Sequence, residues 1–420
     1  MSGTFRSLRG FNYRTWACGS IVSNVGTWMQ RTAQDWLVLT QLTHNDATAV
    51  GAVMALQFAP QVLLLPLTGF AADHLDRRKL LVATHAAMGV LALGLGGLTI
   101  LGLVQVWHVY VFALLHGCVS AFDAPARQSF VSELVDEADL SNAVALNSTS
   151  FHAARMIGPA TAGILIAAIG SGWVFLLNAA SFAAVLCSLR FLRVGELHRK
   201  DRPRRTRGSL VEGFTYVWRR PDLKVVLLMT FLIGTFGLNF PIFISTMTVS
   251  VFHEGAGKYG LLSSTMAIGS VAGALLAARR ANPRFTFLLS GAAIFGIGLT
   301  LAALMPSYGL FSIALVLIGI AAQTFTTTAN SSVQLSTEPA MRGRVLAILL
   351  AITLGGTPIG APIAGWVADT FGPRWALGVG AAAGFAAALI GIVYLAKYRS
   401  LRLRVDAGRL RFTFDDRRPA

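Results

Sequence analysis

The sequence predicts an all-α membrane protein built from two related bundles of six helices each. Composition is the first reason: 54% of the 420 residues are hydrophobic and 13% are charged, whereas a soluble domain carries about 25% charged residues. Mean hydropathy is correspondingly high, at +0.62. The second reason is a series of long apolar runs, and the third is an internal repeat that relates the two halves of the chain.

Twelve apolar runs are long enough to cross a bilayer as helices. They cover residues 15–39, 47–69, 80–103, 107–127, 144–168, 173–192, 224–250, 258–278, 285–305, 308–331, 345–368 and 375–396. An even number of spans leaves both termini on one side of the membrane. Lys and Arg concentrate in the tails and in alternate loops, which is typical of cytoplasmic segments. The net charge of +16 therefore indicates membrane orientation, and we expect no nucleic-acid partner.

The runs and the basic segments between them divide the chain into four parts. We expect a first six-helix bundle at 1–195, a basic cytoplasmic linker at 196–222, a second six-helix bundle at 223–396 and a basic cytoplasmic tail at 397–420. The end of the linker, residues 209–220, alternates aliphatic and aromatic residues with polar ones. This pattern predicts an amphipathic helix on the membrane surface.

The internal repeat is visible at small residues and at a tryptophan. A shift of 202 residues superposes Gly158 on Gly360, Gly163 on Gly365 and Trp173 on Trp375. Duplicated bundles in a membrane place a substrate site between them, near the bilayer midplane. We therefore expect any ligand site to lie between the two halves.

A charged turn joins the second and third runs. Its pattern, Gly69-x-x-x-Asp73-x-x-x-Arg77-Arg78-Lys79, resembles the signature between the second and third helices of the major facilitator superfamily. Two positions depart from that signature, because His74 replaces its usual Arg and Asp76 replaces its usual second Gly. Other stretches resemble the bacterial drug-exporter and enterobactin-exporter branch: Asn24-x-Gly26-x-Trp28-Met-Gln30, Asp35-Trp-Leu-Val-Leu, Pro125-Ala-Arg-Gln-Ser-Phe-Val, Gly158-Pro159 and Gly355-Gly-Thr-Pro-Ile-Gly.

The resemblance implies the twelve-helix major facilitator fold and a secondary transporter of the bacterial inner membrane. Such a transporter exports a lipophilic or amphipathic small molecule by proton antiport with alternating access. We expect a monomer in the lipid bilayer, with the cargo and protons as its partners and with no cofactor or metal. One alternative is a lysolipid or lipid flippase of the same fold. Another is a membrane-embedded lipid-modifying enzyme, although no catalytic cluster or metal-ligand spacing supports it.

The first run contains the candidate site for proton coupling. Asp35 is the one carboxylate well inside a predicted span, and Arg31 lies one helical turn before it. Asn24 shares their face and Gln34 flanks them, as expected of a helix that lines a cavity. A movement that separates Arg31 from Asp35 would change the proton occupancy of the carboxyl group. The alternative interpretation is a structural ion pair near the helix end.

Two further groups follow from the resemblance. An inner charge latch would consist of Gly69, Asp73, Arg77, Arg78, Asp123 and Arg127, with Asp123 and Arg127 at the same depth as Asp73 and Arg77. It would hold the outward-facing state closed on the cytoplasmic side. The fifth run partly resembles the antiporter motif of exporters, through Arg155, Gly158, Pro159 and Gly163. A Gly-Pro pair in a helix favours a kink and close packing.

The remaining candidates are polar side chains inside apolar runs. His116 lies in the fourth run, and Asn239 and Gln323 lie in the second half of the chain, where no embedded charge is found. Amides can bind cargo or bridge helices. A lone histidine is more often a packing group than a ligand. We expect these residues to line the cavity together with Asn24 and Gln34.

Overall fold

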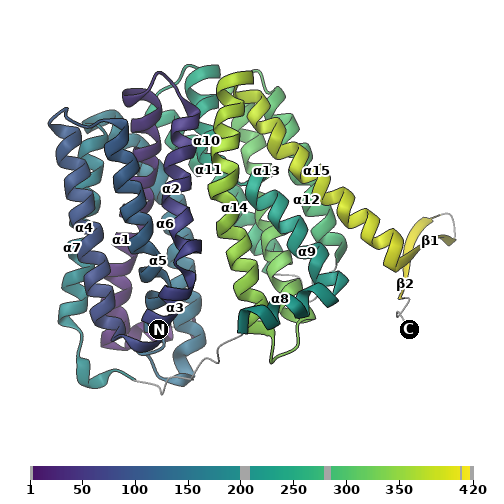
Figure 1. Ribbon diagram of the computed structural model, residues 1–420, viewed down its shortest axis with the longest axis horizontal. Helices are drawn as coiled ribbons and strands as arrows, with labels where there is room; N and C mark the ends of the chain where they lie inside the picture. Colours follow the sequence, from purple (N-terminus) through teal and green to yellow (C-terminus); the bar gives the residue numbers. More distant parts are fainter. Residues whose placement is uncertain (1–2, 199–208, 279–284, 407–408, 417–420) are drawn as a thin grey trace.

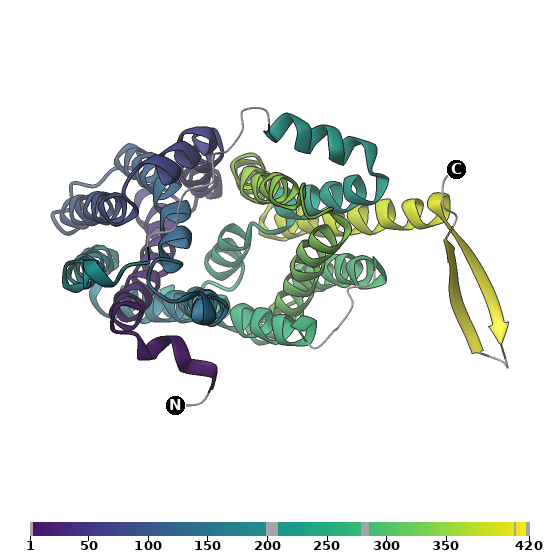
Figure 2. The same cartoon turned by 90° about the horizontal axis from the view of Figure 1, so that it is seen from below.

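The computed structural model describes residues 3–198, 209–278, 285–406 and 409–416. Within these ranges the chain is almost wholly helical, and its helices form two bundles that lie side by side (Figures 1 and 2). Only the last described residues form strands. The predicted all-α membrane fold with two related bundles is confirmed.

The N-terminal bundle contains seven α-helices. Its elements are η1 (Gly3–Arg9), α1 (Phe11–Leu37), the π-helical turn η2 (Val38–Leu42), α2 (Ala47–Leu63), α3 (Leu65–His74), α4 (Arg77–Ile100), α5 (Val106–Val131), α6 (Glu137–Ile169) and α7 (Ser171–Phe191), with the short turn η3 (Val194–Glu196) after it. The aspartates before α2 and α4 cap them, because Asp46 accepts a hydrogen bond from the Ala49 amide and Asp76 from the Lys79 amide.

The C-terminal bundle follows the linker. Its elements are α8 (Ser209–Arg219), α9 (Pro221–Leu232), η4 (Ile233–Gly237), α10 (Phe240–Thr246), η5 (Met247–Val251), α11 (Ala256–Ala278), α12 (Phe285–Leu304), α13 (Tyr308–Ser336), α14 (Arg342–Phe371) and α15 (Pro373–Tyr398). The segments η4 and η5 are π-helical turns, so α9 to η5 form a single bent span from Pro221 to Val251.

Ten helical segments of the described residues are long and apolar enough to cross a membrane. The first two predicted runs fall outside this count for different reasons. The helix α1 carries a polar stripe that lowers its hydropathy, and α2 has only 17 residues because the helix breaks at Leu64, just before α3. Both nevertheless lie among the other helices of the N-terminal bundle (Figure 1).

The two bundles repeat each other in structure as they do in sequence. The helices α6 and α14 both end at a glycine with positive φ, 85° at Gly170 and 101° at Gly372. Positive φ is readily adopted only by glycine, which explains both positions. The first span of each half also ends in a π-helical turn, η2 in one and η5 in the other. The repeat therefore includes backbone irregularities as well as helices.

Matching glycine contacts join the bundles. In the first, α6 packs on α11, and a Cβ on Gly163 would lie 2.7 Å from the carbonyl oxygen of Ala256. In the second, α14 packs on α2, and a Cβ on Gly51 would lie 2.5 Å from the carbonyl oxygen of Ala361. Small residues permit such close helix packing in membranes. The repeated glycines thus build the interface between the halves.

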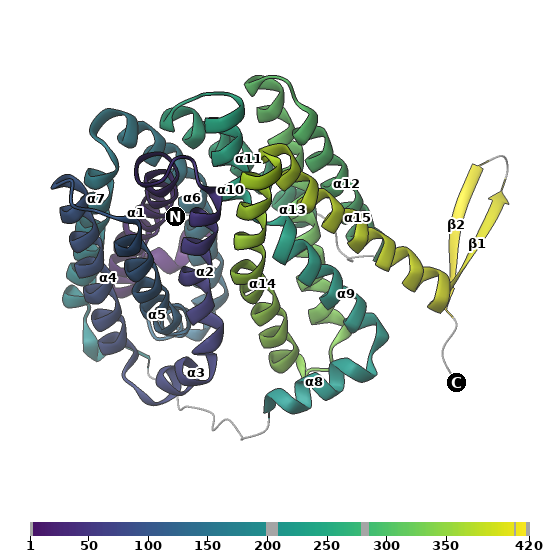
Figure 3. The ribbon, with the colours of Figure 1, turned by 45° about the horizontal axis from the view of Figure 1, so that its top comes forward.

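The predicted amphipathic helix is present as α8, which crosses beneath the C-terminal bundle (Figure 3). Val211, Phe214 and Trp218 are exposed, whereas Val217 is buried. The opposite face packs on the start of α14, where a Cβ on Gly213 would lie 3.1 Å from Cβ of Arg344. An apolar face directed away from the protein fits a helix that lies in the membrane surface. Residues 199–208 of the linker lie outside the described residues.

The basic tail contains a structure that the sequence analysis did not predict. The strands β1 (Arg399–Asp406) and β2 (Arg409–Asp416) pair antiparallel and project from the end of α15 (Figures 1 and 3). The alternation of Leu401, Leu403 and Val405 with polar residues is the period of a strand. That signal was overlooked because the high charge of the tail favoured a solvated segment.

Candidate functional site

The polar stripe of α1 brings several groups without partners into the protein interior. Asp35 is 7% exposed and Gln34 is 2% exposed. Among the described residues, no hydrogen bond or ion pair reaches the Asp35 carboxylate, and neither Gln34 Nε2 nor Arg31 Nε has a hydrogen-bond partner. Buried polar groups are normally satisfied, so two unsatisfied donors beside a buried carboxylate mark a candidate ligand site.

Arg31 does not pair with Asp35, although one helical turn separates them. Within the described part of the chain, no ion pair joins the two. The Arg31 guanidinium instead lies over two rings, 5.0 Å from the centroid of Trp28 and 5.3 Å from that of Phe58 on α2. Cation–π contact favours this placement, since each ring face attracts the charge. The expected ion pair is therefore not formed in this conformation.

Arg155 reaches the same tryptophan from α6. Its guanidinium lies 5.4 Å from the Trp28 centroid, and Phe151 packs edge-on against Trp28 at 5.9 Å. Arg155 itself is exposed, so its guanidinium is not enclosed by the neighbouring side chains. We call Trp28, Arg31, Phe58, Phe151 and Arg155 the Trp28 cluster. It lies where α1, α2 and α6 meet, and α2 and α6 make the most extensive contacts with the other bundle.

The glycines of the fifth predicted run place α6 against its neighbours. A Cβ on Gly158 would lie 2.5 Å from Cβ of Trp28, so this glycine permits the close contact of α6 with α1. The carbonyl oxygen of Pro159 would lie 2.6 Å from a Cβ on Gly260 of α11, close to Gly163. The predicted antiporter-like residues thus have two locations. Arg155 and Gly158 face α1, whereas Pro159 and Gly163 face the opposite bundle.

The bundles are locked together at the end of the molecule far from α8, which we call the Asp369 end. Asp369 of α14 accepts hydrogen bonds from the amides of Ala47 and Thr48, both at 2.8 Å, and from the Thr48 hydroxyl at 2.5 Å. A carboxylate at a helix N-terminus is favoured by the free amides and by the helix dipole. The carboxylate therefore fastens α2 to the other bundle.

Aromatic stacking and a continuous core strengthen this end. Trp36 of α1 stacks on Tyr259 of α11, with ring centroids 5.6 Å apart. One apolar core there contains residues of both bundles, including Leu39, Val50, Leu262 and Ala364. Towards the α8 end, the N-terminal bundle has a separate core of its own that includes Trp16, Leu81 and Phe130. The two halves thus share a core at one end only.

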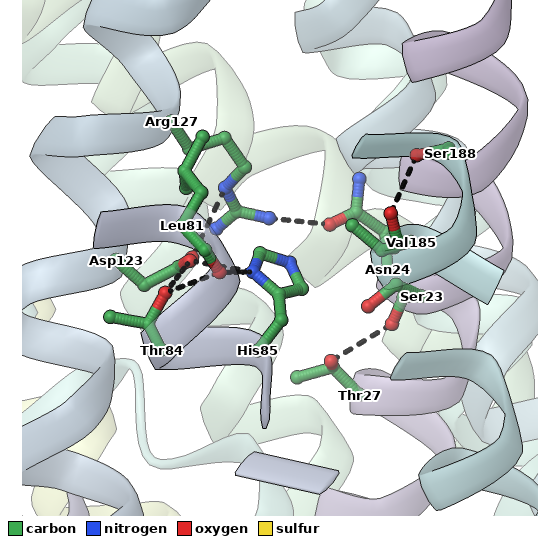
Figure 4. Close-up of polar contacts among 10 residues, drawn as sticks. All are labelled: Ser23, Asn24, Thr27, Leu81, Thr84, His85, Asp123, Arg127, Val185 and Ser188. Atoms are coloured by element: carbon green, nitrogen blue, oxygen red, sulfur yellow. Dashed lines mark hydrogen bonds and ion pairs between the residues drawn. The ribbon is translucent and has the colours of Figure 1, made fainter. Parts of the chain in front are cut away.

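A network of buried polar groups crosses the N-terminal bundle (Figure 4). Asp123 of α5 is 3% exposed, and its carboxylate accepts a hydrogen bond from Thr84 at 3.0 Å. It also lies 3.2 Å from His85 Nδ1 and 3.5 Å from Arg127 Nε. Arg127 in turn donates to Asn24 Oδ1 at 2.7 Å. The network links α1, α4 and α5 through one carboxylate.

The described latch residues form two separate groups: Arg77 and Arg78 bond to other residues, and Asp123 pairs with Arg127. Arg77 Nη1 pairs with Glu133 Oε1 at 2.6 Å, and Arg78 Nε donates to the Leu189 carbonyl oxygen at 3.0 Å. Asp123 lies deeper than Arg77, because its partners on α4 are about two helical turns further along that helix. Gly69 and Asp73 lie on α3, and their burial and side-chain contacts are outside what the structure describes. The latch itself stays a prediction.

Two partners in these networks were not among the predicted site residues. His85 lies within an apolar run, and its charge-bearing neighbour Asp123 is on another helix. Glu133 directly follows the fourth span, where a carboxylate looks like an ordinary loop residue. A histidine inside a membrane span is itself a signal of function, so His85 could have been selected on that ground. Glu133, the partner of Arg77, could not have been selected from the sequence.

The remaining predicted cavity residues occupy separate places. His116 is 4% exposed, with Nδ1 3.3 Å from the Ser120 hydroxyl. Asn239 is fully buried; its Nδ2 donates to the Thr235 carbonyl oxygen at 2.7 Å, and its Oδ1 has no partner among the described residues. Gln323 Nε2 donates to the Thr327 hydroxyl at 3.2 Å. No cluster in the described part of the chain could hold a metal ion.

Duplicated membrane bundles that are joined at one end are the architecture of a membrane transporter. Residues 2–408 match the family described as "Transmembrane secretion effector" (MFS_3). The chain belongs to this family, and the predicted resemblance is confirmed. It is therefore a multi-pass membrane transporter.

Relatives match most of the chain at low identity. The staphyloferrin A transporter of Staphylococcus aureus is 26% identical over 353 residues, covering 83% of this chain and 87% of the relative. The multidrug efflux pump Tap of Mycolicibacterium fortuitum is 26% identical over 374 residues, covering 84% and 88%. The enterobactin exporter EntS of Shigella flexneri is 26% identical over 369 residues, covering 87% of each.

Solved structures show the same fold. A bacterial homologue of the human lysosomal transporter Spinster, in an inward-facing and unoccupied conformation, superposes with a TM-score of 0.71. The match covers 92% of this chain and 96% of that chain at 15% identity. A similarity at this level of identity establishes the fold and carries no information about the cargo.

Proposed function

We propose that this chain is a proton-driven exporter of an amphipathic small molecule that works by alternating access. The names of its relatives support efflux, since they include two siderophore transporters and a multidrug pump. The observation that carries the coupling mechanism is Asp35. Asp35 is a buried carboxylate to which no described residue gives a hydrogen bond or ion pair, and Arg31 lies one turn before it on the same helix.

The bundle contacts support alternating access. Asp369, the Trp36–Tyr259 stack and the shared core close the molecule at one end. By the positive-inside rule we assign the basic termini, and with them the opposite end, to the cytoplasm, so the Asp369 end would be closed towards the outside. Rocking the bundles about the glycine contacts of α2 and α6 would release the Asp369 bonds and expose the same polar groups to the other side.

Proton entry would drive the cycle through Asp35. A membrane potential of 100 mV supplies about 2.3 kcal/mol for each charge that crosses. A carboxyl group that takes up a proton on the outside and releases it on the inside converts this energy into movement. Arg31 lies one turn away on the same helix, so a movement of the helices can change the distance between the two side chains.

The test is transport in proteoliposomes with an imposed pH gradient, using amphipathic fluorescent dyes of different charge. Wild-type protein is expected to concentrate dye against its gradient. Asp35→Asn is expected to abolish gradient-driven accumulation and to retain dye exchange at equal pH, because only the proton step is removed. Asp46→Asn, whose carboxylate caps α2, is the control and should accumulate dye.

Two results would overturn the proposal. Gradient-driven accumulation that persists in Asp35→Asn would remove Asp35 from the coupling step. Movement of a fluorescent lysolipid across the bilayer without any response to the pH gradient, in the absence of dye transport, would favour the flippase alternative.

A further inference from the structure

The Trp28 cluster contains more positive charge than its surroundings neutralise. Neither the Arg31 nor the Arg155 guanidinium forms a hydrogen bond or ion pair with any described residue, and Arg31 Nε is a buried donor without an acceptor. The third nearby cation, Arg127, is already neutralised by Asp123. Two unpaired guanidinium groups on one tryptophan are costly inside a membrane protein unless an anion joins them.

We propose that the Trp28 cluster is the binding site for the anionic group of an aromatic acid, so that the cargo of this transporter carries a carboxylate or a similar oxyanion on an aromatic ring. This inference rests on the proposed export function and narrows its cargo. A guanidinium presents a planar fork of donors that matches a carboxylate in bidentate fashion.

The chemistry of the cluster excludes the opposite charge. A cationic cargo would meet Arg31 and Arg155 together, and both would repel it. The rings provide the complementary apolar surface: Trp28, Phe58 and Phe151 come from three different helices and would contact an aromatic body at faces and edges. Gln34 lies one turn along α1 from Arg31, and its unpartnered Nε2 is a further donor for an oxygen.

The location of the cluster fits a binding site. Two of its helices, α2 and α6, make the most extensive contacts with the C-terminal bundle, and the closed Asp369 end begins just beyond Arg31, at the Trp36–Tyr259 stack. Arg155 is exposed, so an anion can reach it without any rearrangement of the closed end. An anion bound there would be released to the other side once the stack separates.

The experiment measures binding of three probes that share one ring system and differ in charge. Radiolabelled 1-naphthoate, 1-naphthamide and 1-naphthylmethylammonium carry charges of about −1, 0 and +1 at pH 7. Each is bound to wild-type protein in nanodiscs. We expect 1-naphthoate to bind at least about tenfold tighter than either of the others.

Substitutions then assign the effect to the cluster. Arg155→Gln is expected to weaken 1-naphthoate binding about tenfold and to leave 1-naphthamide unchanged, and Arg155→Lys should recover part of the loss. Arg31→Gln should have the same effect on binding. Thermal melting in the nanodisc shows whether each variant is folded, and Arg31→Gln replaces Arg155→Gln in the test if the latter is not. Arg190→Gln, at the end of α7, is the control and should bind like the wild type.

Equal binding of 1-naphthoate and 1-naphthamide to the wild type would overturn the inference. So would no detectable 1-naphthoate binding up to about 1 mM, or an equal loss for both probes in Arg155→Gln. These results are independent of the proton-coupling test. Dye accumulation that depends on Asp35, together with no preference for the acid, would retain the exporter and reject the anion site. Selective binding of 1-naphthoate without gradient-driven transport would retain the anion site and reject the proton-driven exporter.

Discussion

The N-terminal and C-terminal bundles share one fold and bury different chemistry. Every buried Asp and His among the described residues belongs to the N-terminal bundle, namely Asp35, His85, His116 and Asp123. The buried polar residues of the C-terminal bundle are hydroxyls and one amide, including Thr230, Thr246, Thr248 and Asn239. Most of these hydroxyls donate to a carbonyl of their own helix, as Thr230 does to Val226 at 2.8 Å.

This difference divides the work between the halves. Charged groups inside a membrane need partners on other helices, so the N-terminal bundle is organised by networks such as the one around Asp123. Most buried hydroxyls of the C-terminal bundle are bonded within their own helix, and its helices pack closely through glycines. That bundle also carries the π-helical turns η4 and η5, which bend its first span. We infer that the N-terminal bundle carries the charged groups used in transport. The C-terminal bundle would then provide an uncharged surface that moves relative to them.

The largest expected effect comes from breaking the N-terminal network. Asp123→Ala removes the carboxylate that Thr84, His85 and Arg127 share, and leaves the charge of Arg127 without its neutralising partner. We expect the free energy of unfolding to fall by about 3–5 kcal/mol, measured by reversible unfolding in mixed micelles. The control is Asp136→Ala, which breaks an aspartate–histidine pair that is 78% exposed at the carboxylate. Equal losses of unfolding free energy in the two variants would show that burial of the Asp123 carboxylate does not determine its contribution to stability.

Close backbone packing should be the sensitive feature of the C-terminal bundle. A Cβ on Gly360 of α14 would collide with the Thr235 carbonyl oxygen. We expect Gly360→Ala to lower the free energy of unfolding by about 1–3 kcal/mol in the same unfolding assay. Gly378→Ala in α15 meets nothing within 4 Å and should be neutral or stabilising. A neutral Gly360→Ala would show that α14 and η4 can separate at no cost.

The contact between the bundles can be weakened without disturbing either interior. Asp369→Ala removes the acceptor for the first amides of α2 and should destabilise the closed Asp369 end by about 1 kcal/mol. Hydrogen exchange should then quicken about fivefold at the starts of both α2 and α11, because the bundles part together.

The matched control for this experiment is Asp46→Ala, whose carboxylate caps α2 from its own bundle. It should quicken exchange in α2 alone. Faster exchange that is confined to α2 in both variants would mean that Asp369 is only a helix cap and does not hold the bundles together.

The smallest effect is expected for charge on the surface of the C-terminal bundle. Glu212 of α8 pairs with Arg344 of α14 at 2.6 Å, but its side chain is 60% exposed. Glu212→Gln should change the free energy of unfolding by at most about 0.5 kcal/mol, because packing at Gly213 and Val217 also holds α8. A loss as large as that for Asp123→Ala would contradict the division between the bundles.

Much of the fold could be predicted from the sequence. Lipid offers no hydrogen bonds to the backbone, so each apolar run must form a helix, and the predicted run 308–331 is indeed helical within Tyr308–Ser336. The amphipathic linker helix followed from its residue pattern in the same way. The strands of the tail were missed, since their alternation is short and is mixed with charge.

The sequence by itself determined the membrane spans, the duplication and the polar stripe of α1, because each depends on residues that are near neighbours along one helix. Only the tertiary structure decided the partners. Arg31 lies on Trp28 and Phe58 rather than on Asp35, Asp123 takes His85, and Arg77 takes Glu133. Side-chain contacts act over a few ångströms, so they depend on which helices pack together, and that arrangement is a property of the whole chain.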